Sequence, residues 1–188
     1  MPDSGRPPAR GGISPRKTVL RGRVPEKGEY FAARAGDSPY PPGTLLPAGA
    51  ALLRPVPAWY HPFVPAERPI PFDYSVIYAD RDLIVADKPH FLPTTTNGRL
   101  QRETLQTRLR VDFGEDDIVP LHRLDRLTAG LVLCSRNPAT RAAYQGIFGK
   151  GSAVKRYRGV VKRPLYMDRE ITLRMHCLLY TSPSPRDK

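Results

Sequence analysis

The chain has 188 residues, a formal net charge of +12 and a hydrophobic content of 40%. This length suits one domain, or one small domain with part of another, and the apolar content is sufficient for a core. The sequence has neither a secretory leader nor an apolar run of the roughly 18 residues that a membrane helix needs. The two cysteines, Cys134 and Cys177, form no CxxC pair, so we expect a reduced, cytoplasmic protein.

The N-terminal part of the chain is dominated by proline, because 15 of the 22 prolines precede residue 72. Residues 1–18 are rich in Pro, Gly and Arg and are predicted to be a disordered basic arm. Residues 19–54 contain short apolar pieces between turn residues, which fits either a small domain or an arm without fixed structure. Residues 55–71 contain six prolines and are predicted to be an extended linker.

The pattern becomes more regular after Pro71. Two β-rich runs, residues 75–78 and 83–87, flank a polar four-residue turn and predict a hairpin. Leu105, Leu109 and Phe113 recur at a spacing of four and predict one face of a helix that ends at Gly114.

Three further elements are predicted downstream. Residues 131–135 form a short apolar run that favours a buried strand. Asn137 and Pro138 are typical of a helix N-cap and first helical position, and this helix should run to about residue 148. A last strand is predicted over residues 157–161. Helices mixed with an antiparallel hairpin indicate an α+β fold.

Positive charge is concentrated around one carboxylate. Between residues 121 and 163 there are ten Lys and Arg residues, and the only acidic residue is Asp125. Such a segment suits a polyanion, because Lys and Arg displace its condensed counterions. Nearby cations also favour the ionised form of a carboxyl group. Asp125 is therefore either a group that does chemistry on a bound nucleic acid or a turn cap within a solvated basic face.

Three ordered motifs resemble the RluA-type pseudouridine synthases. The stretch 122–130 (His-Arg-Leu-Asp-Arg-Leu-Thr-Ala-Gly) resembles their signature, with Ala129 where the family usually has Ser. Residues 77–89, continued by Phe-Leu-Pro-Thr at 91–94, resemble the family's opening hairpin and the extended segment after it. Residues 155–161 resemble its Lys-x-Tyr strand. The resemblance runs from about residue 71 to residue 161, roughly half of the chain.

The resemblance implies a mixed, mainly antiparallel catalytic sheet and cofactor-free isomerisation of uridine to pseudouridine in rRNA or tRNA. Asp125 would be the essential carboxylate, acting at the ribose as base or nucleophile, on a uridine flipped out of its stack. Tyr157 would pack on the flipped uracil. Arg123 would fill the vacated space or hold a flanking phosphate.

Other residues receive supporting roles from the basic segment and from the resemblance. Four cations besides Arg123 are expected to bind RNA: Arg126, Lys155, Arg156 and Arg158. Three residues are expected to shape the loop: His122, Thr128 and Gly130. Residues 19–54 would then be an accessory RNA-binding domain, if they fold. The histidines lack metal-ligand spacing, so we expect no metal, and we expect a monomer without an obligate protein partner.

The C-terminal part departs from the family. The family-like pattern fades after residue 161, before a motif that brings a basic residue beside the catalytic Asp in the family. Residues 176–188 look foreign. Residues 72–175 are therefore expected to be the N-terminal part of a catalytic domain, incomplete and inactive in this chain. The alternative is a basic RNA-binding module without catalysis.

Overall fold

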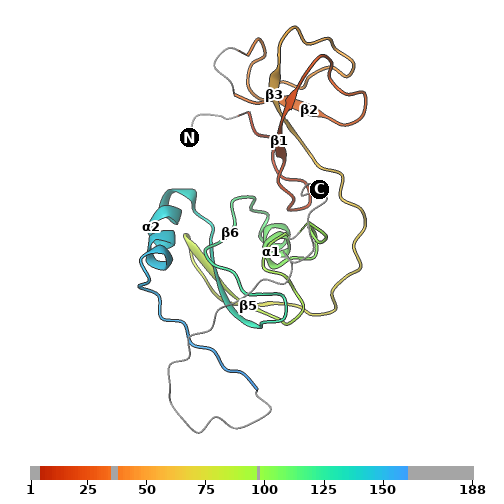
Figure 1. The fold of residues 1–188 in the computed structure, drawn as a ribbon. Coiled ribbons are helices and arrows are strands. Elements are labelled where there is room, and N and C mark those ends of the chain that lie inside the picture. The colour runs from red at the N-terminus through yellow and green to blue at the C-terminus, as the bar shows by residue number, and fades with distance from the viewer. Residues whose placement is uncertain (1–4, 35–37, 97, 161–188) are drawn as a thin grey trace, which may run out of the picture. The chain divides into compact units, whose positions relative to one another are not determined.

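The computed structural model describes residues 5–34, 38–96 and 98–160 (Figure 1). In these residues the regular structure consists of two antiparallel sheets and two helices, which confirms the α+β class. The chain divides into two compact units, residues 1–153 and residues 154–188. Both sheets and both helices belong to the first unit.

The N-terminal sheet has three strands, β1 (Arg16–Leu20), β2 (Tyr30–Ala32) and β3 (Val56–Tyr60), with β3 in the centre. One face of this sheet packs on a core of its own, whose buried members are Leu20, Val24, Ala32, Leu46, Leu52, Val56 and Ala58. Residues 19–54 therefore contribute to a folded sheet rather than to an arm without structure.

Two predicted segments overlap strands and are wrong there. Residues 16–18 of the predicted disordered arm lie in β1, and residues 56–60 of the predicted linker form β3. Proline suggested a linker, but the period-two alternation of a strand is present: Val56 and Ala58 are buried, and Pro57 between them is not. β2 pairs with β3 only opposite residues 58–60. Pro57 lies beyond that pairing, so its missing N–H removes no bond to β2.

The second sheet has the order β4-β5-β7-β6. Its strands are β4 (Ser75–Ala79), β5 (Leu83–Lys88), β6 (Val119–Pro120) and β7 (Gly130–Ser135). The predicted hairpin is confirmed as β4 and β5, with a register shift between Val76 and Tyr78. The Asp80 carboxylate closes the turn by accepting from the backbone N–H groups of Asp82 and Leu83, at 2.8 and 2.7 Å.

The predicted helix that ends at Gly114 is confirmed as α1 (Leu105–Phe113). The Thr104 hydroxyl caps its N-terminus by accepting from the Thr107 N–H, and Gly114 ends it with a left-handed φ of 65°. Its buried side chains Leu105 and Leu109 join the core of the second sheet. The other buried members of that core are Ile84, Ala86, Leu92, Ile118, Val132 and Cys134.

Helix α2 (Pro138–Gly149) also has the predicted cap, with the Asn137 side chain accepting from the Ala139 N–H. The strand predicted at 157–161 is wrong for residues 157–160, which form no regular element, and residue 161 lies outside the described residues. A strand exists only where its backbone pairs with a neighbour, and the run of β-prone residues alone does not supply one. None of the helices in the described ranges is long and apolar enough to cross a membrane.

Candidate active site

The family-like signature forms the loop between β6 and β7, which we call the Asp125 loop (residues 121–129). β7, which follows this loop, pairs along its whole length with β5, from Leu83 opposite Ser135 to Lys88 opposite Gly130. The loop therefore leaves a central strand of the sheet at a fixed point. It carries or adjoins six of the predicted site residues: His122, Arg123, Asp125, Arg126, Thr128 and Gly130.

A buried threonine holds the residue before the carboxylate. The Thr94 hydroxyl accepts from the Leu124 N–H at 3.1 Å and donates to the Leu124 carbonyl oxygen at 2.7 Å. The Leu124 side chain packs against the core of the second sheet. Its neighbours Arg123 and Asp125 are exposed, so the fold presents an acid and a guanidinium group to solvent from one anchored residue.

The loop closes after Asp125 with a tight turn, in which the Thr128 N–H donates to the Asp125 carbonyl oxygen at 3.0 Å. His90 Nδ1 donates to the Leu127 carbonyl oxygen at 2.7 Å, which ties the turn to the segment after β5. The chain enters β7 through Gly130, whose φ of 131° is a conformation that L side chains rarely adopt. Glycine is therefore required at this position.

His122 extends the sheet into the loop. Its Nε2 accepts from the Leu133 N–H at 3.1 Å, while the Leu121 N–H donates to the Leu133 carbonyl oxygen at 2.8 Å. The His122 ring lies 5.0 Å from the ring of Phe148 on α2. The imidazole thus serves as a structural hydrogen-bond acceptor at the start of the Asp125 loop.

One buried cation lies within electrostatic range of the carboxylate. Lys88, at the end of β5, is fully buried, and its Nζ donates to the carbonyl oxygens of Pro89 and Leu92 at 3.0 and 2.8 Å. Burial lowers the pKa of Lys88, and the negative charge of Asp125 acts in the opposite direction. The structure therefore places a structural cation near Asp125.

Some of the basic residues around Asp125 have structural partners. Arg136 pairs with Glu115, lies over the ring of Phe113 and donates to the Asp80 carbonyl oxygen. Arg141 donates to the Asp117 carbonyl oxygen and to the Ser135 hydroxyl. These two guanidinium groups hold the sheet to its surroundings, so the charge that remains to attract a polyanion is smaller than the sequence count.

The other predicted site residues belong to the second unit. Lys155, Arg156, Tyr157 and Arg158 are exposed and lie in no helix or strand. That Tyr157 and Asp125 act on the same flipped uridine thus stays a prediction. Among the residues that the structure describes, no group of three or more His, Cys, Asp or Glu could hold a metal ion.

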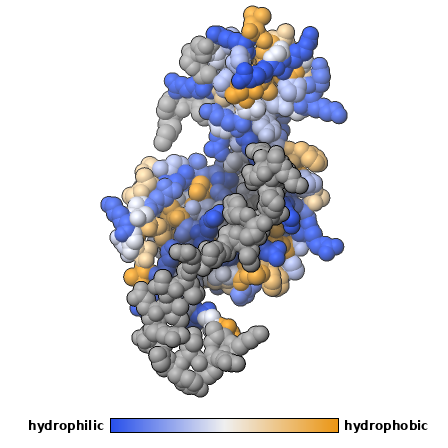
Figure 2. Space-filling view, viewed as in Figure 1, coloured by the Kyte–Doolittle hydropathy of each residue, from blue (hydrophilic) through white to orange (hydrophobic). Residues whose placement is uncertain are grey.

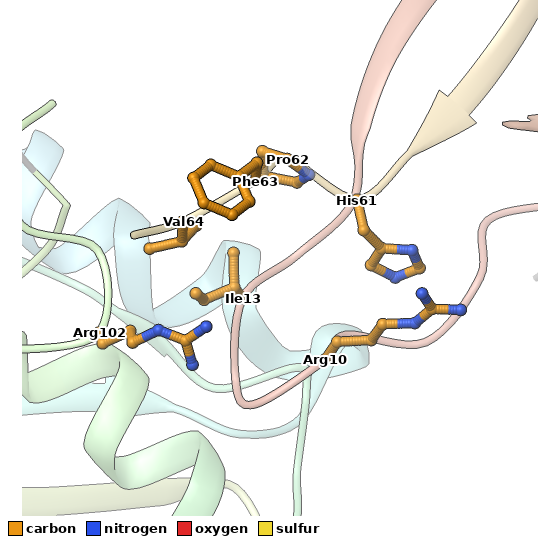
Figure 3. A pocket seen from close by; sticks show the side chains of 7 residues that line it. All are labelled: Arg10, Ile13, His61, Pro62, Phe63, Val64 and Arg102. Carbon is orange, nitrogen blue, oxygen red and sulfur yellow. The ribbon is translucent and has the colours of Figure 1, made fainter. Parts of the chain in front are cut away.

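A pocket of about 310 Å³ lies away from the signature (Figure 3). None of its lining residues comes from the Asp125 loop; they are Arg10, Ile13, His61, Pro62, Phe63, Val64 and Arg102. The aliphatic and aromatic side chains of Ile13, Phe63 and Val64 group on one side, and Arg10 lies beside His61.

Two residues that hold the Asp125 loop, Thr94 and His90, and the buried cation Lys88 were not singled out from the sequence. Thr94 and Lys88 lie within the family-like segments, but their roles as a clamp and as a buried cation depend on tertiary contacts. His90 carried no signal beyond its place between those segments. A polar residue that is followed by an apolar run gives no indication of which distant carbonyl oxygen it will bind.

Comparison with known proteins matches residues 82–184 of this chain to the RNA pseudouridylate synthase family. The match continues into residues 176–184, part of the segment that looked foreign. RNA pseudouridine synthase 5 of Arabidopsis thaliana is 31% identical over 123 residues, which cover 60% of this chain and 32% of that protein. An uncharacterized RNA pseudouridine synthase of Synechocystis is 33% identical over 103 residues, covering 55% and 35%.

The tRNA pseudouridine(31) synthase of Saccharomyces cerevisiae is 27% identical over 89 residues, covering 47% of this chain and 22% of that protein. The solved structure of human RNA pseudouridylate synthase domain containing 1 aligns with a TM-score of 0.34 and 24% identity, covering 45% of this chain and 31% of that chain. The chain spans about a third of the length of the first two relatives. With a family match over more than half of its residues, the chain belongs to the RNA pseudouridylate synthase family.

Proposed function

We propose that this chain is part of an enzyme that converts uridine to pseudouridine in rRNA or tRNA, with Asp125 as its essential carboxylate. The observation that carries the proposal is the presentation of Asp125 from an anchored loop, exposed beside Arg123 and Arg126. A turn cap would direct its carboxylate to nearby N–H groups, whereas the turn here is closed by the Asp125 carbonyl oxygen.

In the proposed reaction the bond between ribose C1′ and uracil N1 breaks, the uracil turns, and C5 bonds to C1′. The proton on C5 is lost and N1 gains one, so the product is an isomer and no cofactor is consumed. Asp125 acts at the ribose, as base or as nucleophile. The target uridine would leave its stack to reach the loop, at a cost of a few kcal/mol. The role proposed for the exposed Arg123 is to fill the gap or to bind a flanking phosphate.

We also propose that the 188-residue chain alone does not turn over. Tyr157 is proposed to pack on the uracil, yet residues 154–160 form no strand that would fix its ring. A site held loosely by about an ångström loses orders of magnitude in rate.

The test replaces Asp125 by Asn in the full-length protein, with Asp87→Asn as the control. Asp87 is an exposed acid on β5 in the same sheet, so both variants lose one negative charge. We expect Asp125→Asn to abolish pseudouridine formation, read by chemical labelling and primer extension, without weakening RNA binding. Asp87→Asn should retain activity. Modification by Asp125→Asn at the level of the unaltered protein would refute the assignment, and equal loss in both variants would show only a charge effect.

A further inference from the structure

The N-terminal sheet has a second face, opposite its core, that the proposed reaction does not use. Successive side chains of a strand point to opposite faces. Because Val56 and Ala58 face the core, Pro57 and Trp59 face outward. The cross-strand partners of these two residues are Val19 opposite Pro57, and Lys17 and Phe31 on either side of Trp59. We call these five residues the outer face.

Aromatic and cationic side chains meet on the outer face. Lys17, Trp59 and Phe31 form one row across β1, β3 and β2, and Leu45 extends it by pairing with Phe31. The Lys17 ammonium lies 5.3 Å from the centre of the Trp59 ring, and the Arg6 guanidinium lies 5.9 Å from it. The attraction of a cation to an aromatic ring thus gathers two positive charges beside Trp59.

The row continues towards the pocket of Figure 3. The Phe31 ring lies edge-on to the His61 ring at 6.2 Å, and His61 lines that pocket. Arg10 lies beside His61, where its guanidinium group is paired with the Glu29 carboxylate at 2.6 Å, and the exposed ring of Phe63 provides apolar surface. A path of cations and aromatic rings therefore leads from β1 to a concavity large enough for a nucleobase.

Charge favours a polyanion as the occupant of this path. Residues 5–60 contain nine Lys and Arg against three Asp and Glu, whereas residues 61–120 contain seven against ten. Hydrophilic residues surround the N-terminal sheet in the space-filling view, with hydrophobic residues among them (Figure 2). A second copy of this chain would bring like charges together, which disfavours self-association through the outer face.

We propose that the outer face binds a single-stranded stretch of RNA. Phosphates would lie against Arg6 and Lys17, and bases against the rings of Trp59 and Phe31. Proteins that hold single strands combine a basic surface with aromatic side chains in this manner. The choice of RNA rests on the proposed function, but the surface would act in substrate binding and not in catalysis.

The chain contains a single tryptophan, Trp59, so its fluorescence reports on this surface alone. The experiment titrates the 188-residue chain with an oligouridylate of about eight nucleotides, a length within the range that single-strand-binding domains cover. We expect saturable quenching whose affinity falls with salt. Lys17→Gln should reduce the slope of log affinity against log salt by about 0.7, as expected for one lost phosphate contact on a single strand. Arg6→Gln should act in the same direction.

Lys27→Gln is the matched control, because Lys27 is an exposed cation in the turn before β2 and not on the outer face. It should leave the slope unchanged. Absence of quenching, or an equal effect of Lys27→Gln and Lys17→Gln, would overturn the proposal. Equal quenching by inorganic polyphosphate would exclude base contacts and overturn the assignment to RNA.

Asp125→Asn should leave the quenching intact, which separates this proposal from the catalytic one. If the full-length protein modifies RNA but oligouridylate does not quench Trp59, the proposal for the outer face is wrong and the catalytic assignment is unaffected. If quenching is present and Asp125→Asn remains active, the catalytic assignment fails alone.

Discussion

The Asp125 loop and residues 154–160 both carry family motifs, but the loop lies between two paired strands, whereas the described residues 154–160 lie in no helix or strand. Around Asp125, backbone groups of the loop and of β7 are bound by Thr94, His90 and His122. Residues 154–160 are mostly exposed and form no helix or strand. Two motifs of the same family thus differ in how far the surrounding chain fixes them. The difference shows that a catalytic motif becomes a site only when the fold supplies its supporting partners.

The largest effect on stability is expected from glycine replacement in the two regions. Gly130→Ala should destabilise the fold by about 2 kcal/mol, because its φ of 131° is strained for any L side chain. Gly159→Ala is the matched change in the other region, where the added methyl group meets nothing within 4 Å and the backbone carries no such φ. Its effect should stay within about 0.5 kcal/mol. Urea denaturation of both variants measures the difference, and equal effects would mean that the Asp125 loop is no better defined than residues 154–160.

A slightly smaller effect is expected at the threonine clamp. Thr94→Val keeps the shape of the side chain but leaves the Leu124 N–H and carbonyl groups without their partner. The cost should be about 1.5 kcal/mol. Thr96→Val serves as the control, because Thr96 is exposed two residues further on. Thermal denaturation compares the two variants; a Thr94→Val protein as stable as the control would show that the clamp does not hold the loop.

Local sequence signals predicted the elements whose partners lie nearby. The β4–β5 hairpin, the Asn137 cap and the end of α1 at Gly114 all follow from residues a few positions apart. β3 was not predicted because the residues it pairs with in β1 and β2 are 25 or more positions away. Its prolines also suggested a linker, although its side chains alternate between buried and partly exposed positions at residues 56–58.

The candidate site shows the same difference between local sequence signals and contacts with distant residues. The signature predicted Asp125 as the essential carboxylate, and the structure places it in a loop before the predicted strand β7. Its supports at Thr94 and His90 depend on contacts that span 30 residues or more, Thr94 with Leu124 and His90 with Leu127. The strand expected at Tyr157 needs a pairing partner, and a single-sequence pattern cannot provide it.

The smallest expected effect is a change in the pKa of the buried Lys88 when the charge of Asp125 is removed. The negative charge of Asp125 raises the pKa of Lys88, against the larger lowering by burial. Asp125→Asn should therefore lower the pKa of Lys88 further, observed by NMR of the lysine Nζ, and Asp87→Asn should not change it. A rise, or no change, in the Asp125→Asn protein would contradict the proximity of the two groups.

The same titration has a consequence for stability. The pKa of Lys88 in the folded chain lies below its ordinary value of 10.5, so between these two values the unfolded state binds more protons. The contribution of Lys88 to folding stability should therefore increase as pH rises towards 10.5. Denaturation midpoints over this range, compared with a Lys88→Met variant, isolate that contribution.

Hydrogen–deuterium exchange of the 188-residue chain tests most directly whether the Asp125 loop is preformed. The account predicts slow exchange at the amides of Leu124, Thr128 and Leu133, each of which donates a hydrogen bond in the structure. Residues 156–160 should exchange at least about tenfold faster, as expected for backbone outside a cooperative unit. If the loop and residues 156–160 exchange at the same rate, Asp125 is not held by the fold, and the central contrast between the two regions is wrong.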